Sequence, residues 1–141
     1  MYKKFLSVFM AVILSMTFVI GNTVSAAVIV PDSPMYSYTR SCSSELTTSG
    51  TMATCKSTAT GYYNKTTKIV FKQTLQKKNS SGGWNDVTNA TWTSTVYSDR
   101  GSVTNYKYSL SSGTYRLKTV FTVYAGTPYE TITKYSSEKI I

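Results

Sequence analysis

The sequence predicts an all-β protein: an antiparallel sandwich of the immunoglobulin or fibronectin III type, with about seven to eight strands. Two observations lead to this fold class. Serine and threonine dominate the polar residues and the chain holds twelve tyrosines, a composition that favours strands over helices. Apolar residues also recur at every second position in short segments, and turn residues separate these segments at the spacing of a sandwich or barrel.

Residues 1–26 are predicted to be a secretory signal peptide. Lys3 and Lys4 precede an apolar run from Phe5 to Ile20, and the small residues that follow end in a signal-peptidase site at Ala26. A membrane anchor is the alternative, but it needs about 20 apolar residues, and this run is shorter and contains hydroxyl groups. We therefore expect a secreted, extracellular protein that does not span the membrane.

The remainder is predicted to form one domain. Residues 27–35 contain two prolines and are expected to be an extended leader, whereas residues 36–141 would form a single β-sandwich. The whole chain has a formal charge of +9; loss of the signal peptide leaves 13 basic and six acidic residues, so the exported form remains cationic at about +7.

The strands are expected in order along the domain, with "GYYNK", "NSSGG" and "DRG" as connections. Their predicted ranges are 36–46, 51–60, 67–78, 84–98 (as one or two strands), 102–110, 115–124 and 129–140. In the third segment Ile69, Phe71 and Leu75 share one face. In the fifth, Tyr106, Tyr108 and Leu110 are expected to share a side.

The two cysteines are predicted to form a disulfide, because an exported protein meets oxidising conditions. A two-residue loop at Thr48–Ser49 would place Thr47 opposite Gly50 and bring Cys42 opposite Cys55, on a rung where a disulfide fits. A longer loop that uses Gly50 is an alternative and would shift this register. A redox or metal pair would need a different spacing or more ligands.

A tyrosine corner is predicted where the sixth strand begins. Tyr115 follows a glycine-containing turn and stands two residues before the apolar Leu117, as in immunoglobulin-like sandwiches. Its hydroxyl is expected to bond to a backbone carbonyl between Leu110 and Gly113. The inward face of this strand would carry Tyr115, Leu117, Thr119, Phe121 and Val123.

The sequence offers no catalytic residues. The chain has no histidine, so the usual serine and cysteine triads and a histidine base are excluded. Its six acidic residues form no short-spaced cluster, although a distant pair that converges as in a glycosidase remains an alternative. We predict a protein that is not an enzyme and has no cofactor and no metal.

Basic residues are the main candidates for binding. The third, sixth and final strands are expected to adjoin in one sheet, which would merge their cations into a face that attracts anionic cell-wall polymers or lipid headgroups. The candidates are Lys68, Lys72, Lys78, Arg116, Lys118 and Lys134. The alternative is that these cations only keep an exposed sheet soluble. No motif indicates specific nucleic-acid binding.

Tryptophan is the second candidate for binding. Trp84 adjoins a glycine turn and could stack on a sugar ring if it is exposed. Trp92 alternates with small hydroxyl residues and is expected to face the core.

Several segments resemble a family of small exported proteins of Gram-positive bacteria, whose function is unknown. They are "SGTMATCKSTATGY", "LQKKNSSGGWNDV" and "SGTYRLKTVFTVYAG" followed by "ETITKYS". The resemblance covers nearly all of the chain after the leader and implies an immunoglobulin-like sandwich, but no activity.

Two functions are compatible with these features. The first is a non-enzymatic binding or structural module at the cell envelope or matrix, which would show salt-sensitive retention on cell walls. The second is a secreted antimicrobial or bacteriocin-like protein, although the chain offers no amphipathic helix for insertion into a bilayer.

Overall fold

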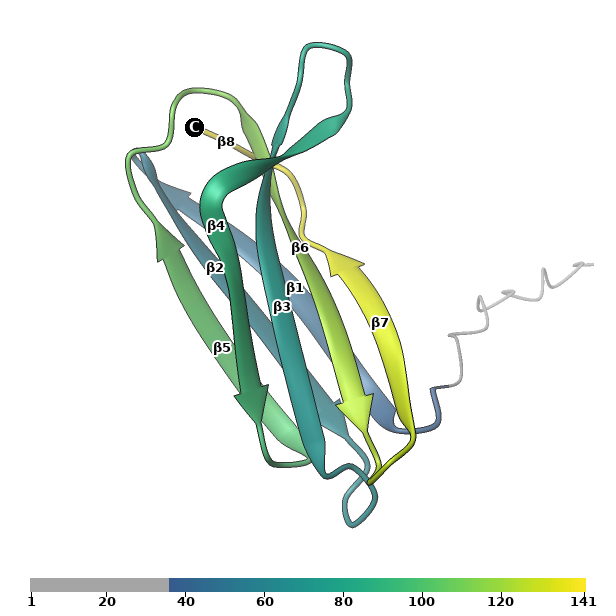
Figure 1. Cartoon of the computed structure of the whole chain (residues 1–141). Coiled ribbons are helices and arrows are strands. Elements are labelled where there is room, and N and C mark those ends of the chain that lie inside the picture. The colour runs from purple at the N-terminus through teal and green to yellow at the C-terminus, as the bar shows by residue number, and fades with distance from the viewer. Residues whose placement is uncertain (1–35) are drawn as a thin grey trace, which may run out of the picture. The chain divides into compact units, whose positions relative to one another are not determined.

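The computed structural model describes residues 36–141, which form two antiparallel β-sheets packed face to face (Figure 1). This arrangement confirms the predicted all-β sandwich. The predicted signal peptide (1–26) and extended leader (27–35) lie outside the described residues. Between residues 36 and 141 there is no helix of the length and hydropathy needed to cross a membrane.

The described residues form eight strands: β1 (Thr39–Ser49), β2 (Met52–Gly61), β3 (Lys68–Lys78), β4 (Trp84–Val96), β5 (Arg100–Lys107), β6 (Thr114–Tyr124), β7 (Tyr129–Tyr135) and β8 (Lys139–Ile140). One sheet has the order β1-β2-β5. The other has the order β4-β3-β6-β7, and the short β8 also pairs with β6. Because β4 pairs with β3 and does not join β5, the strand order is of the fibronectin III type.

The alternation predicted for β6 is confirmed. Its buried positions are Tyr115, Leu117, Thr119, Phe121 and Val123. On the neighbouring β3, Ile69, Phe71 and Leu75 are fully buried as well. The rings of Phe71 and Phe121 meet edge to face, with centroids 5.5 Å apart.

A buried polar network separates the apolar core into two clusters and joins the two sheets. Gln73 of β3 donates from Nε2 to the Ser57 hydroxyl at 2.7 Å and to the Cys55 carbonyl at 3.1 Å, both on β2. Its Oε1 accepts from Asn105 of β5 at 2.7 Å. The Thr119 hydroxyl on β6 lies 2.8 Å from the Ser57 hydroxyl. These bonds satisfy polar groups that would otherwise be costly to bury.

The predicted tyrosine corner is confirmed. Tyr115 is 1% exposed, and its hydroxyl donates to the Ser111 carbonyl at 2.6 Å. This acceptor lies within the predicted range. The bond ties the connection between β5 and β6 to the first buried residue of β6.

The prediction that Tyr106, Tyr108 and Leu110 share one side is wrong. The two tyrosines are exposed, whereas Leu110 is only 6% exposed. Ser109 between them has a φ of 57°, a left-handed conformation that ends the strand alternation. Leu110 therefore turns into the core, and its N–H donates to the Thr51 carbonyl at 3.0 Å.

The predicted disulfide is also wrong: Cys42 and Cys55 are both free thiols. Ser49 pairs with Met52, so the hairpin turns at Gly50–Thr51 and Cys55 lies opposite Leu46. Cys42 is then four positions from Cys55 along the ladder, about 13 Å, which is too far for a disulfide. The register is shifted by Gly50, as the alternative expected, but the loop has two residues and is not longer. The φ of Gly50, 54°, suits the first position of a type II′ turn.

Strand β4 runs as one strand through a large bulge. Thr74 of β3 pairs with Thr91 and Gln76 pairs with Asp86, so two steps along β3 correspond to five along β4. The four residues 87–90 therefore lie opposite the single residue Leu75, and Asn89 among them has a φ of 55°. The bulge separates Trp92, which packs against the core as predicted, from the hairpin end of the strand.

Candidate functional site

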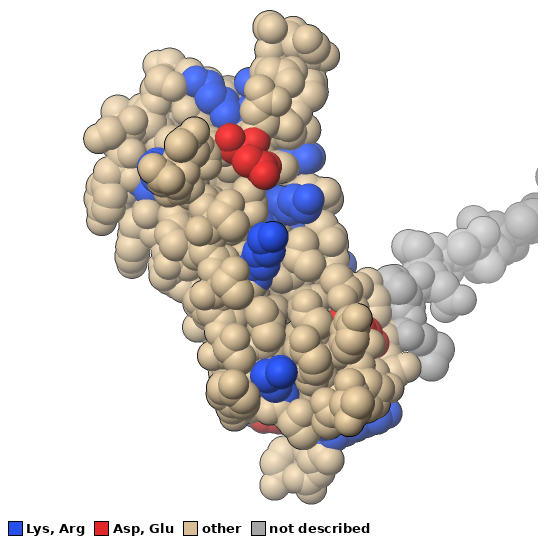
Figure 2. All heavy atoms as spheres, in the orientation of Figure 1, with Lys and Arg blue, Asp and Glu red and all other residues tan. Residues whose placement is uncertain are grey.

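Five of the six predicted basic residues share the outer surface of the β4-β3-β6-β7 sheet. They alternate with buried residues on β3 and β6: Lys68, Lys72, Lys78, Arg116 and Lys118. We call this surface, with the aromatic and threonine side chains on it, the outer face. Figure 2 shows Lys and Arg side chains spaced along this side of the molecule, with few Asp and Glu between them.

Lys134 does not share the outer face. It pairs with Thr119, whose side chain is fully buried between the sheets, and residues opposite each other on a ladder point to the same side. Lys134 therefore lies on the inner side of β7.

On that side Lys134 lies near the Cys42 thiol. Burial has the largest effect on this thiol and raises its pKa, whereas the charge of Lys134 lowers the pKa and that of Glu130 raises it.

Arg116 contacts two aromatic rings and an amide on the outer face. Its Cζ is 4.2 Å from the centroid of the Trp84 ring and 4.2 Å from that of Tyr135. Its Nε donates to Gln76 Oε1 at 2.9 Å, and Gln76 Nε2 donates to Asp86 Oδ1 at 2.8 Å. The rings and the amide fix the plane of the guanidinium group, and cation–π contacts of this kind are worth about 0.5–1 kcal/mol each at exposed sites.

Among residues 36–141, no carboxylate forms an ion pair with Arg116. Within residues 36–141 the ion pairs are Lys78–Glu138, at 3.3 Å, and Asp99–Arg100, at 3.6 Å. Since Arg116 uses Nε for Gln76, the donors on its two terminal nitrogens remain for another acceptor. A guanidinium in this state can bind a phosphate or carboxylate through two parallel hydrogen bonds.

Cations and aromatic rings also alternate along the rest of the outer face. At one end Lys68 Nζ lies 3.8 Å from the centroid of the Tyr124 ring, which lies 5.4 Å from the Tyr129 ring. At the other end Lys78 Nζ lies 5.5 Å from the Trp84 ring. Between them, Lys72 pairs with Thr93 and Val120, and Lys118 pairs with Thr74 and Tyr135.

The predicted stacking residue Trp84 is half-buried, and its ring contacts two cations. Its role in the structure is therefore to orient Arg116. Gln76 and Tyr135, which complete this arrangement, were not among the predicted site residues. Their signal in the sequence is weak, because an outward position on a strand does not reveal which residues of distant strands lie beside it.

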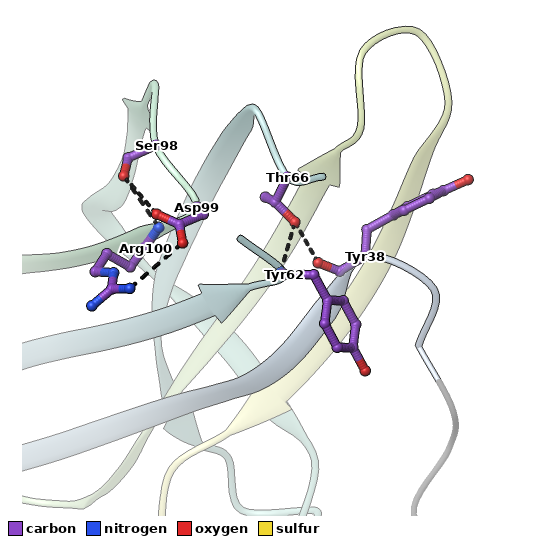
Figure 3. Close-up of polar contacts among 6 residues, drawn as sticks. All are labelled: Tyr38, Tyr62, Thr66, Ser98, Asp99 and Arg100. Carbon is purple, nitrogen blue, oxygen red and sulfur yellow. Dashed lines mark hydrogen bonds and ion pairs between the residues drawn. The ribbon is translucent and has the colours of Figure 1, made fainter. Parts of the chain in front are cut away.

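At the end of the molecule away from the β3–β4 hairpin, the loop after β2 is held by hydrogen bonds between a side chain and backbone groups (Figure 3). Thr66 donates from its hydroxyl to the Tyr38 carbonyl at 2.6 Å and accepts from the Tyr62 N–H at 3.1 Å. Gly61 packs so closely on Thr66 that a Cβ would overlap its side chain. These contacts fix the loop after β2 against the start of β1.

Comparison of the chain with known protein families, with curated proteins and with solved structures finds no match in any of the three. Among the described residues, no three His, Cys, Asp or Glu side chains are grouped closely enough to hold a metal ion.

Proposed function

We propose that the protein is a secreted, non-enzymatic binding module whose outer face holds an anionic polymer of the cell envelope. The observation that carries this proposal is Arg116, a guanidinium group that contacts two aromatic rings and has no ion-pair partner among residues 36–141. Four lysines share its surface. Positive charge gathered in this way raises the local concentration of a polyanion.

The length of the outer face favours a polymer over a small molecule. Lys68 and Lys78 stand ten positions apart on β3, a span of about 33 Å. Small-molecule ligands are usually enclosed in a cleft, whereas cations on an extended sheet can contact successive repeats of a chain. A wall polymer with one phosphate per repeat, such as poly(glycerol phosphate), fits this pattern.

The test is retention of the protein on purified cell walls and on immobilised poly(glycerol phosphate). We expect retention at about 50 mM sodium chloride and release at about 500 mM, because salt screens exposed charges. Lys72→Glu should weaken binding on the order of fivefold. Lys56→Glu is the matched control, since Lys56 is exposed on β2 in the other sheet and undergoes the same change of charge.

Arg116→Lys separates geometry from charge. It keeps the positive charge but removes the planar group and its contacts, so we expect it to weaken binding about threefold or more. Equal retention at both salt concentrations, equal loss in the Lys56 variant, or equally strong binding to anionic lipid vesicles would contradict the proposal.

A further inference from the structure

The β3–β4 hairpin and the β5–β6 connection lie at the same end of the molecule (Figure 1). Residues of both segments line a cleft there. We call it the hairpin cleft. It has a volume of about 410 Å³, and its walls include Lys77, Lys78, Lys107, Asp86, Ser109 and Ser111. A cleft of this size is in the range of small-ligand sites, about 300–1,000 Å³.

We infer that the hairpin cleft binds a compact anion with two linked phosphate groups. Lys77, Lys78 and Lys107 line the cleft together with Asp86, whose carboxylate accepts a hydrogen bond from Gln76. The Lys78 ammonium is ion-paired with Glu138, so the positive charge available to a ligand comes from Lys77 and Lys107. A diphosphate carries enough negative charge and enough acceptor oxygens to engage more than one of the lysines at once. The inference rests on Lys77 and Lys107, which are not residues of the outer face, and does not depend on the proposed function.

Two of the ammonium groups are held in place by neutral oxygen atoms. Lys77 Nζ donates to the Ser111 hydroxyl at 2.7 Å and lies 5.4 Å from the centroid of the Tyr115 ring. Lys107 Nζ donates to the Asn89 carbonyl at 3.4 Å. Each ammonium has three donors, so each keeps donors for a ligand, and neither belongs to the ion pairs among the described residues.

The cleft also coincides with strained backbone. Ser109 in its wall has a φ of 57°, and Asn89, which accepts from Lys107, has a φ of 55°. Left-handed conformations are uncommon at residues other than glycine; asparagine adopts them readily, whereas at Ser109 the conformation costs on the order of 1 kcal/mol. Such strain persists only where the surrounding fold maintains it, and strained residues are often found at functional sites. Here it bends β4 and the β5–β6 connection to form the two walls.

The geometry makes the hairpin cleft separable from the outer face by mutation. Lys77 pairs with the buried Tyr115 and Lys107 with the buried Ala53, so both lysines leave their strands on the inner side. The outer-face residues Lys72 and Lys118 leave on the opposite side and do not line the cleft. Lys78 belongs to both surfaces and is therefore left unchanged in the test.

The experiment is calorimetric titration of the purified protein with inorganic pyrophosphate, in metal-free buffer at about 50 mM sodium chloride. We expect saturable binding to one site, with orthophosphate at least about tenfold weaker. The double variant Lys77→Gln/Lys107→Gln should lose about tenfold or more in affinity. The control Lys72→Gln/Lys118→Gln, which removes the same charge from the outer face, should bind as the unmodified protein does.

The test does not depend on the folding of the double variant, because a second measurement uses the unmodified protein. In an NMR titration, pyrophosphate should shift the backbone amide resonances of Ser109, Ser111 and Asn85. Absence of saturable binding, shifts confined to other residues, or equal loss in both double variants would overturn the inference. Isopentenyl diphosphate and ADP then distinguish a diphosphate on an apolar chain from one on a nucleoside. If neither binds as pyrophosphate does, the inference fails as well.

Discussion

At the scale of single residues, charge and burial decide what each polar side chain can do. Arg116 is half-buried, yet two rings and an amide hold it without neutralising it. Cys55 shows the opposite case, because full burial against apolar neighbours removes its reactivity. Burial raises the pKa of its thiol to about 12, and the thiolate is the reactive form of cysteine.

This pKa predicts a loss of stability in alkali. The folded-state pKa lies above the ordinary value of 9.0, so between pH 9 and pH 12 the unfolded chain releases a proton that the folded protein keeps. The free energy of unfolding should therefore fall with rising pH, by up to about 1.4 kcal/mol per pH unit from this thiol. Urea unfolding across this range measures the slope.

Cys55→Ala is the reference variant for that measurement. It should be less stable at pH 7, because it removes buried atoms, but its stability should fall less steeply above pH 9 than that of the unmodified protein. Parallel slopes in the two proteins would contradict the assignment. Alkylation of the unfolded, unreduced protein should modify both cysteines, as expected for free thiols.

At the scale of elements, turn geometry sets which side chains face each other. The β1–β2 hairpin turns at Gly50–Thr51 because Gly50 accepts a positive φ. A turn two residues earlier would have placed Cys42 opposite Cys55. One backbone position thus decides whether the domain can form a disulfide.

Gly50→Ala should test the turn directly. The substituted residue would have to adopt a φ of 54°, and we expect unfolding free energy to fall by about 1 kcal/mol or more. Space is not the cause, since, beyond the two chain neighbours, no atom of residues 36–141 lies within 4 Å of a Cβ at this position. Thr51→Ala is the control, with an expected change within about 0.5 kcal/mol; similar losses in both variants, measured by urea unfolding, would argue against this turn.

At the scale of the whole molecule, the buried polar network fixes how the two sheets sit on each other. Gln73, on β3, contacts both β2 and β5 of the opposite sheet, and Thr119, on β6, contacts β1 and β2. Apolar contacts tolerate sliding, whereas hydrogen bonds require particular partners. The network therefore helps to place β3 and β6, the strands that carry the outer face.

Gln73→Leu should destabilise the domain by about 2–4 kcal/mol, because it leaves Asn105, Ser57 and the Cys55 carbonyl without their bonds to Gln73. The control is Thr58→Val, which removes an exposed hydroxyl bonded to Ser43 at 2.7 Å and should cost less than about 0.5 kcal/mol. Chemical denaturation compares the two. Equal effects would show that the network adds nothing beyond ordinary packing.

The sequence by itself determined the features that depend on near neighbours in the chain. Alternation identifies the inward residues of β6, because successive side chains of a strand point to opposite faces. The tyrosine corner was equally predictable, since Tyr115 and its acceptor Ser111 are four residues apart. The expected strand order also placed the third, sixth and final strands, which carry lysines, side by side in one sheet.

Only the tertiary structure decided the features that join distant segments. Arg116 meets Trp84 and Tyr135 because β4 and β7 flank the pair β3-β6. Lys134 lies on the inner side of β7 because the register between β6 and β7 pairs it with the buried Thr119. The hairpin cleft needs both a bulge in β4 and a left-handed residue after β5. Alternation fixes a side chain's face, whereas its neighbours depend on register and turns, which tertiary packing sets.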